Sequence, residues 1–417
     1  MTQIKSNIPK IRFKEFSWEW EEKKINQTNL EVIDWDRWNN YPNWDDFSSE
    51  WYCLFMNAKN VTNWWFVFNE KSFITKEKDE QLNKWKLKRW DLVLTTRWTI
   101  WNFAYFDDKI KFDNLRINSW MVILRNNNQN LSSNYIYKYF DFSLLKKQIS
   151  RISFWSAQPQ LTVKDIKSLN ISFPTLKEQQ KISSFLSSVD EKIEKIKEKK
   201  KNLLDYKKWV MQKIFNQEIR FKDENWEEFR EWEKKKLGEI VTFSKWKWLS
   251  KDVITEDWKN KCIHYWELFT KYWPKIKSIL SNTNLEWNLI FSEWNEILMP
   301  TSDVTPNWLA TWSALLEKNV ILWWDILIIK WEKLYNLFFA YYISSHKQDI
   351  MKLVSWSTVY HLYGSDMKKL KLFLPTLKEQ EKIADFLSGI DEKIEKVSDE
   401  LGKIEEFKKG LLQGMFV

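Results

Sequence analysis

Residues 174–195 read PTLKEQQKISSFLSSVDEKIEK, and residues 375–396 read PTLKEQEKIADFLSGIDEKIEK. The two copies lie 201 positions apart and agree at 17 of 22 positions. A repeat with this period in a chain of 417 residues indicates two similar halves that each end in the same element. The sequence therefore predicts a duplicated protein.

Each copy begins a long helix. Thr175 and Glu178 have the spacing of a capping box, in which the hydroxyl and the carboxylate bond the free amides at a helix start. The second copy repeats them as Thr376 and Glu379. Apolar residues then recur at spacings of 4 and 3, so we expect two heptad seams that pack together as an antiparallel coiled coil. The predicted seam residues are Ile182, Leu186, Val189, Ile193, Ile196, Leu203, Ile383, Leu387, Ile390, Ile394, Val397, Leu401 and Ile404.

The stretches outside these helices have a different pattern. Short apolar runs alternate with turn residues and short helical segments, which is typical of a compact mixed α/β domain. We predict an α/β (α+β) fold with two such domains in pseudo-twofold tandem, joined by the two long helices. The domains diverge in sequence far more than the helices do, so we expect the helices to act as a ruler between two binding domains. The predicted boundaries are 1–173 and 218–374 for the domains, and 174–217 and 375–417 for the helices.

The composition argues against several classes of protein. A net charge of +9 is compatible with a polyanionic partner. Two Cys and three His are too few for a cysteine–histidine metal cluster or a disulfide framework. We find no GxxxxGK[ST] motif and no Pro-Pro dipeptide of an adenine methyltransferase motif, which argues against a standalone methyltransferase or motor but does not exclude every enzyme. We assign no catalytic, cofactor-binding or metal-binding residue in this chain. Without a long apolar run or an apolar leader, we expect a cytoplasmic protein with no membrane partner.

Tryptophan and glycine occur in unusual numbers. The chain has 30 Trp and 6 Gly, although average usage of about 7% Gly would give roughly 29. Many Trp have the flanks of turns, where Gly is the usual residue because it adopts φ > 0 freely, and Trp209 stands where the second copy has Gly410. One interpretation is an aromatic-rich protein that stacks bases or fills its core with Trp. We favour the other, that most Trp are genetically glycine, written as recoded UGA codons.

Three motifs carry a family resemblance. Residues 91–102 read DLVLTTRWTIWN, residues 153–161 read SFWSAQPQL, and PTLKEQ occurs at 174–179 and 375–380. With Trp read as Gly, the first two become DLVLTTRGTIGN and SFGSAQPQL. Together with the tandem helices, these motifs resemble the specificity subunit of type I restriction-modification systems over essentially the whole chain.

The resemblance implies a subunit that is not catalytic by itself, within a type I site-specific deoxyribonuclease and adenine methyltransferase complex. Its domains would be target recognition domains that each read half of a split site in double-stranded DNA, and the coiled coil would set the unread spacer. Two modification subunits would dock on it and use S-adenosylmethionine. Restriction subunits, which use ATP and Mg, would complete the complex.

The candidate DNA-reading residues lie in two corresponding loops. Each loop follows an apolar run and is dense in side chains that bond phosphates or base edges. The alternative is a turn that Thr and Asn side chains hold together, and we weigh the two interpretations equally. In the alignment of the halves, Thr301 matches Thr96, Asn307 matches Asn102, and Ser302 replaces Arg97.

Further candidates precede the long helices. Ser156 and Gln158 would meet phosphates or fix the junction to the helix, and we favour the junction. Ser357 is the counterpart of Ser156, and His361 takes the place of Gln160 and is expected to be structural. The candidate DNA-binding residues are thus Thr96, Arg97, Thr99, Asn102, Ser156, Gln158, Thr301, Ser302, Asn307 and Ser357.

Two other functions are kept as alternatives. A single-chain DNA methyltransferase or nuclease fragment would need cofactor motifs that we do not find. A scaffold built on the coiled coil would not explain why the domains diverge while the helices stay alike, whereas two different half-sites would.

Overall fold

The computed structural model describes the chain apart from a set of short segments and single positions. These are residues 1–6, 35–40, 50, 83, 98, 142, 154–159, 246–253, 256–259, 273, 284–290, 294, 323–324, 332–333 and 357–359. The chain divides into two compact units. The first unit comprises 1–197 and 399–417, and the second comprises 198–398.

The first unit is built on a five-stranded sheet of order β2-β10-β7-β8-β5, in which β5 pairs with β8 in parallel and the other pairs are antiparallel. Its strands are β2 (Leu30–Ile33), β10 (Met121–Asn126), β7 (Leu92–Thr95), β8 (Phe103–Tyr105) and β5 (Asn63–Trp64). The residues of β7 are buried throughout, as expected for a central strand with an unbroken apolar run.

Two smaller sheets, four short α-helices and parts of the two long helices complete the described part of the first unit. The four-stranded sheet has the order β3-β6-β4-β9, and β1 pairs with β11. The strands are β1 (Glu21–Lys24), β3 (Phe47–Ser48), β4 (Cys53–Phe55), β6 (Phe73–Ile74), β9 (Leu115–Arg116) and β11 (Asn170–Phe173). The helices are α1 (Lys76–Gln81), α2 (Ser133–Phe140), α3 (Ser143–Ser153), α4 (Val163–Ser168) and the first part of α5 (Leu176–Phe215).

The second unit repeats this topology. Its five-stranded sheet has the order β13-β22-β18-β20-β16, and the pair at the same end, β16 with β20, is again the parallel one. The order β14-β17-β15-β21 repeats the four-stranded sheet, and β12 pairs with β25 as β1 does with β11. The two halves therefore share one fold although their domain sequences diverge, which confirms the predicted tandem of mixed α/β domains.

The elements of the second unit include one sheet with no named counterpart in the first, formed by β19, β24 and β23. The strands are β12 (Glu233–Lys236), β13 (Thr242–Lys245), β14 (Ile254–Thr255), β15 (Asn260–Ile263), β16 (Lys275–Ile276), β17 (Ser281–Thr283), β18 (Glu296–Pro300), β19 (Ser302–Asp303), β20 (Ser313–Leu315), β21 (Ile321–Leu322), β22 (Ile326–Lys330), β23 (Ser355–Trp356), β24 (Tyr360–His361) and β25 (Lys371–Leu374). The helices are α6 (Glu267–Thr270), α7 (Pro306–Leu309), α8 (Asn336–Ser345), α9 (Lys347–Met351), α10 (Gly364–Met367) and α11 (Leu377–Met415).

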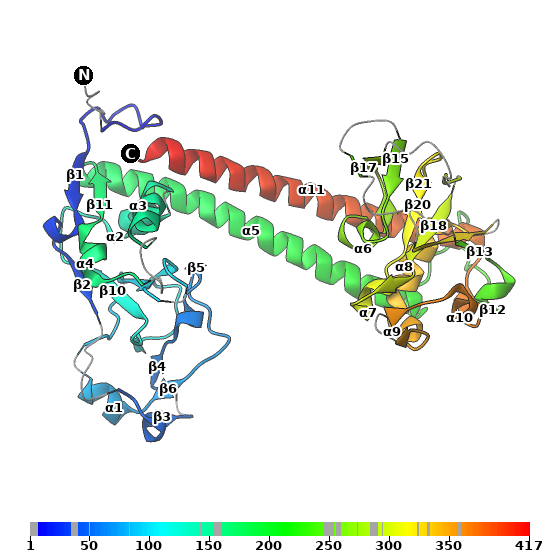
Figure 1. Ribbon diagram of the computed structural model, residues 1–417, viewed down its shortest axis with the longest axis horizontal. Coiled ribbons are helices and arrows are strands. Elements are labelled where there is room, and N and C mark those ends of the chain that lie inside the picture. Colours follow the sequence, from blue (N-terminus) through cyan, green and yellow to red (C-terminus); the bar gives the residue numbers. More distant parts are fainter. Residues whose placement is uncertain are drawn as a thin grey trace. The chain divides into compact units, whose positions relative to one another are not determined.

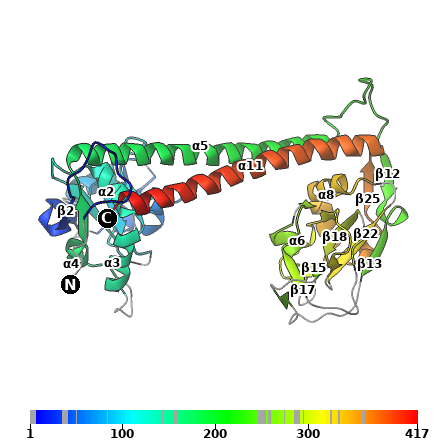
Figure 2. The same cartoon turned by 90° about the horizontal axis from the view of Figure 1, so that it is seen from above.

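In each unit, segments of α5 and α11 run side by side in opposite directions (Figures 1 and 2). The end of α11 and the residue after it, at Leu411, Met415 and Phe416, lie in the core of the first unit with the start of α5. The end of α5, at Ile214 and Phe215, lies in the core of the second unit with the start of α11. Each core is therefore completed by the helix of the other half, and the predicted antiparallel packing of the two helices is confirmed.

Two ion pairs reproduce the repeat across the helices. Lys408 Nζ lies 2.8 Å from Asp190 Oδ1, and Lys207 Nζ lies 2.5 Å from Asp391 Oδ1. The two lysines lie 201 positions apart in the sequence, and so do the two aspartates. The second unit begins at residue 198 and the second segment of the first unit begins at residue 399, again 201 positions apart. The antiparallel pairing thus follows the internal duplication.

The predicted seam residues are buried to different degrees. The structure buries Ile182, Leu186, Val189, Ile193, Ile196, Ile383, Leu387, Ile390 and Val397, and it leaves Leu203, Ile394, Leu401 and Ile404 partly exposed. Of the partly exposed residues, Ile394 packs against the core of the second unit, and Leu401 and Ile404 pack against the core of the first. The apolar face therefore contributes to a domain core near both ends of each long helix.

The expected role of the capping carboxylates is wrong. Thr376 Oγ1 accepts from the Glu379 amide at 3.4 Å, but both carboxylates bind arginines instead of amides. Glu178 accepts from Arg12 Nε and Nη2, both at 2.8 Å, and Glu379 accepts from Arg220 at 3.2 and 2.9 Å. A two-pronged guanidinium–carboxylate contact is stronger than a bond from a neutral amide. Each arginine thereby ties the start of its half to the start of the long helix.

Several tryptophans adopt a backbone conformation that favours glycine. Among the described residues, ten non-glycine residues have positive φ, and five of them are Trp; no described glycine does. These tryptophans are Trp64 (95°), Trp85 (72°), Trp90 (75°), Trp101 (71°) and Trp226 (64°). The left-handed region costs an ordinary L-residue roughly 1–2 kcal/mol but costs glycine little. The backbone therefore supports glycine as the genetic residue at these positions.

We expect the gene to carry UGA at most of the 30 Trp codons but UGG at Trp20 and Trp232. These two match each other in the repeat, each within Glu-Trp-Glu. Trp20 packs edge-on against Tyr135 and Trp232 edge-on against Phe338, and both are buried in domain cores, where an indole is useful. Reading the nucleotide sequence tests this directly, and UGG at every position would refute the recoding.

Replacing Trp226 by glycine is expected to raise the free energy of unfolding of the second unit by about 1 kcal/mol, because it removes left-handed strain at a turn. Trp226 is 81% exposed, so little packing is lost. Trp18 is the matched control, since it is 78% exposed without positive φ, and Trp18→Gly should give no gain. Calorimetric unfolding of both variants measures the difference, and equal effects would contradict the strain at Trp226.

Candidate nucleic-acid interface

The first predicted loop joins β7 to β8 and is held by its own side chains. Thr95 accepts from the Asn102 amide at 3.0 Å, and Asn102 Nδ2 donates to the Val61 carbonyl at 3.0 Å. Thr96 is buried, and its hydroxyl donates to the Trp120 carbonyl at 3.1 Å. These contacts favour the turn-holding interpretation for Thr96 and Asn102. Thr99 is exposed.

Arg97 lies in a different environment from its neighbours. It is half-buried and forms an antiparallel bridge with Gln160, which precedes α4. We assign the Gln160 amide with its oxygen toward the guanidinium, where it accepts from Nε at 3.3 Å and from Nη2 at 3.1 Å. The bridge is closed on its other side by a bond from the Leu161 amide to the Thr96 carbonyl, of 3.0 Å.

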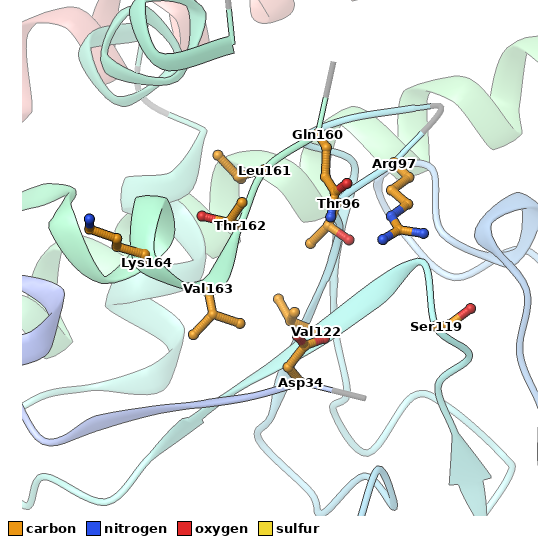
Figure 3. A pocket seen from close by; sticks show the side chains of 10 residues that line it. All are labelled: Asp34, Thr96, Arg97, Ser119, Val122, Gln160, Leu161, Thr162, Val163 and Lys164. Carbon is orange, nitrogen blue, oxygen red and sulfur yellow. The ribbon is translucent and has the colours of Figure 1, made fainter. Parts of the chain in front are cut away.

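The bridge borders a cavity of about 500 Å³. Figure 3 shows Arg97 and Gln160 projecting toward it from neighbouring stretches of chain, with Ser119 on the opposite side. The cavity combines the cations of Arg97 and Lys164, hydroxyl groups and an amide, which are groups that bond phosphates and base edges, with the carboxylate of Asp34. Its lining residues are Asp34, Thr96, Arg97, Ser119, Val122, Gln160, Leu161, Thr162, Val163 and Lys164.

The second unit has the same bridge with different side chains. Ser302 on β19 pairs with His361 on β24, and the Leu362 amide bonds the Thr301 carbonyl at 3.0 Å, as Leu161 bonds Thr96. The match of His361 with Gln160 in the sequence is thus reproduced in space. The structural role expected of His361 stays a prediction.

An aspartate organises the second bridge. Thr301 is buried and donates to the Asp325 carbonyl oxygen, and Ser302 Oγ donates to Asp325 Oδ2 at 2.9 Å. Asp325 stands where the first unit has Trp120, because each accepts from the amide of the matching threonine. The bridge of the first unit therefore presents a guanidinium, whereas the bridge of the second unit is bonded to a carboxylate.

The sequence match of Asn102 with Asn307 is wrong. Asn102 directly precedes β8, whereas Asn307 is exposed on α7, a short helix inserted before β20. The segment from the bridge residue to the next strand of the five-stranded sheet is 97–103 in the first unit and 302–313 in the second. The loop of the second unit is therefore longer by five residues. The alignment by counting could not detect this insertion. Ser156, Gln158 and Ser357 lie outside the described residues.

An ion pair with a buried carboxylate lies in the five-stranded sheet of each unit. Arg125 on β10 bonds Asp91 at 3.0 and 2.7 Å, and Lys330 on β22 lies 3.1 Å from Glu296 at the corresponding place. Burial raises the pKa of Glu296, against the opposing ammonium group of Lys330. Sequence reasoning missed these pairs because their partners meet only through strand pairing.

Both cysteine side chains are buried. Burial raises the pKa of the Cys53 and Cys262 thiols to about 12. No group of three or more His, Cys, Asp or Glu among the described residues is placed to hold a metal ion. Within the same residues, no helix has the length and apolar character to cross a membrane.

Two repeated units that present different side chains at one shared bridge have the architecture of a tandem recognition protein. The family model described as type I restriction modification DNA specificity domain matches residues 37–205 and 230–406. The chain therefore belongs to this family, as a specificity subunit of a type I restriction-modification system with two target recognition domains.

Individual relatives agree with this assignment. The type I restriction enzyme MjaVIII specificity subunit of Methanocaldococcus jannaschii is 24% identical over 318 residues, which cover 71% of this chain and 72% of the relative. The putative MjaX specificity subunit of the same organism is 25% identical over 350 residues, covering 80% and 79%.

Solved structures show the same fold. The S subunit of a type I restriction-modification system from M. genitalium has a TM-score of 0.60 and 16% identity, covering 98% of this chain and 99% of that one. A chain from a structural study of the assembly and conformational transition of the type I R-M system has a TM-score of 0.57 and 13% identity, covering 94% and 96%.

Proposed function

We propose that this subunit binds double-stranded DNA at a bipartite sequence, each target recognition domain reading one half, with α5 and α11 setting the unread spacer. The observation that carries this proposal is the repeated bridge, which has the same backbone bonds in both units but Arg97 and Gln160 in one and Ser302 and His361 in the other. A constant frame with exchanged side chains suits two different half-sites. The net charge of +9 supports a polyanionic ligand.

The same proposal covers the partners. The subunit is not catalytic by itself and acts with two modification subunits, one for each repeated unit, and with restriction subunits. S-adenosylmethionine, ATP and Mg are used by those partners, and the complex works on cytoplasmic DNA. The repetition of the fold supports two equivalent docking places. The single-chain enzyme and the coiled-coil scaffold are not favoured, because the family match covers both halves as specificity domains.

The purified subunit is expected neither to cut nor to methylate DNA, and methylation should appear only when the modification partner is added. Transfer of labelled methyl groups from S-adenosylmethionine to duplex DNA measures this, with the subunit alone, the partner alone and the two together. Turnover of S-adenosylmethionine by the isolated subunit would overturn the proposal.

A further inference from the structure

We propose that Arg97, held in place by Gln160, determines specificity in the first target recognition domain by reading a guanine of the first half-site. This inference rests on the proposed DNA-binding function and deepens it, since it names one residue and the base it recognises. Gln160 acts as a positioning residue through Arg97.

The hydrogen bonds leave one edge of the guanidinium for a ligand. Gln160 occupies the side edge, formed by Nε and Nη2, at 3.3 and 3.1 Å. The end edge, formed by Nη1 and Nη2, makes no hydrogen bond to a described residue. The O6 and N7 atoms of guanine accept two parallel bonds from such an edge in the major groove. Because the side edge is fixed, the plane of the fork is set before DNA binds.

The charge of Arg97 also lacks a partner within the described part of the protein. Arg12, Arg89, Arg116, Arg125 and Arg220 each form an ion pair with a carboxylate. Arg97 forms none with a described residue, although it is half-buried beside a cavity. A partly desolvated cation gains most from an acceptor that enters the cavity.

The comparison with the second unit favours a base over a phosphate. Both domains must meet the DNA backbone, so a phosphate contact built on the shared bridge would be useful in both. The second unit has Ser302 at this place, bonded to Asp325, and His361 stacked on Tyr363 with ring centroids 5.6 Å apart. The fork is therefore specific to one half of the chain, as expected for a residue that reads sequence.

The test uses the full-length subunit and the duplex that it selects from a randomised library. Each guanine of that duplex is replaced in turn by 7-deazaguanine, which lacks the N7 acceptor. We expect one replacement, in one half-site, to weaken binding about tenfold or more for the unchanged protein. Arg97→Ala should bind this duplex and the unmodified one equally.

Two further variants keep the outcome clear if Arg97→Ala folds poorly. Arg97→Lys retains the charge without the fork and should also lose discrimination while keeping its affinity for unrelated duplexes. Gln160→Ala should reduce discrimination without changing that background affinity, which a merely structural role would not do. Lys164→Ala, at an exposed position bordering the same cavity, controls for loss of charge and should affect both duplexes alike.

The inference is overturned if Arg97→Ala still discriminates at every guanine. It is also overturned if Arg97→Ala weakens all duplexes equally and lowers the salt dependence of binding, which is the behaviour of a phosphate contact. If the unchanged protein selects no sequence at all, the proposed function fails and the inference fails with it.

Discussion

Asp190→Asn is expected to lower the free energy of unfolding of the first unit by about 3 kcal/mol. Asp190 is bound by Lys138 Nζ at 2.5 Å and by Lys408 Nζ at 2.8 Å. The lysine side chains are only 8% and 21% exposed. The variant removes the carboxylate of the Lys138 ion pair and leaves Lys408 with Asp141 Oδ2, 3.2 Å away. Because Lys408 belongs to α11 and Asp190 to α5, part of the loss reports on the packing of α11 in the first unit.

Calorimetry of the full-length protein measures this effect as a fall of about 6–12 °C in the unfolding temperature of one of two transitions. Asp391→Asn, which removes the partner of Lys207, should instead destabilise the second unit. Glu191→Gln is the matched control, because its ion pair with Lys195 is exposed and screened by solvent, so its loss should change stability little. A loss for Asp190→Asn no larger than that of the control would contradict the buried pairing.

The same variant gives a pH dependence with a definite sign. Burial alone would raise the pKa of Asp190, but Lys138 and Lys408 outweigh it and hold the pKa below its ordinary value. A carboxylate with a lowered pKa in the folded state stabilises fully above the unfolded value of about 4 and loses that contribution as the pH falls further. The difference between Asp190→Asn and the unchanged protein should therefore be constant above about pH 5 and shrink below about pH 4.

Inserting one heptad after Ile196 and a matching heptad after Val397 is expected to lengthen the preferred DNA spacer by about three base pairs. Each heptad adds roughly 10 Å of helix and keeps both apolar seams in register. The spacing of base pairs is about 3.4 Å, so the added length corresponds to about three of them. The insertion points adjoin the boundaries of the two units, at 197–198 and 398–399.

Methylation mapping on a library of spacers, with the modification partner present, measures the preferred length. Both half-site sequences should be unchanged, with some loss of activity because the domains also rotate around the duplex. Insertion into α5 alone is the control, and it should impair activity at every spacer because the paired seams no longer match. An unchanged spacer preference with good activity would mean that the partner subunits position the domains.

The sequence predicts the duplication, the long helices and their antiparallel pairing because each depends on patterns among residues close together in the chain. Seventeen identical residues of 22 identify the repeat, and heptad spacing identifies the seam. The role of Glu178 could not be predicted, since Arg12, its partner, is 166 residues away and competes with the local capping bond. Local patterns report local contacts, and a distant cation overrides them.

The candidate interface was predictable only in part. Apolar runs place the loops after β7 and β18, and the matched positions of Gln160 and His361 are visible in the sequence. Asp325 had no such signal, because it reaches Thr301 and Ser302 only through the pairing of β18 with β22. The five-residue insertion that separates Asn307 from the place of Asn102 was equally hidden, since divergent loops offer no register.

The central claim is that one chain reads two half-sites separated by a spacer it does not read. Selection of duplexes from a randomised library by the full-length subunit, at one fixed salt concentration, tests this most directly. The account predicts two enriched blocks of different sequence at a fixed separation, with no base preference between them. A single contiguous block, or enrichment of no sequence at all, would contradict it.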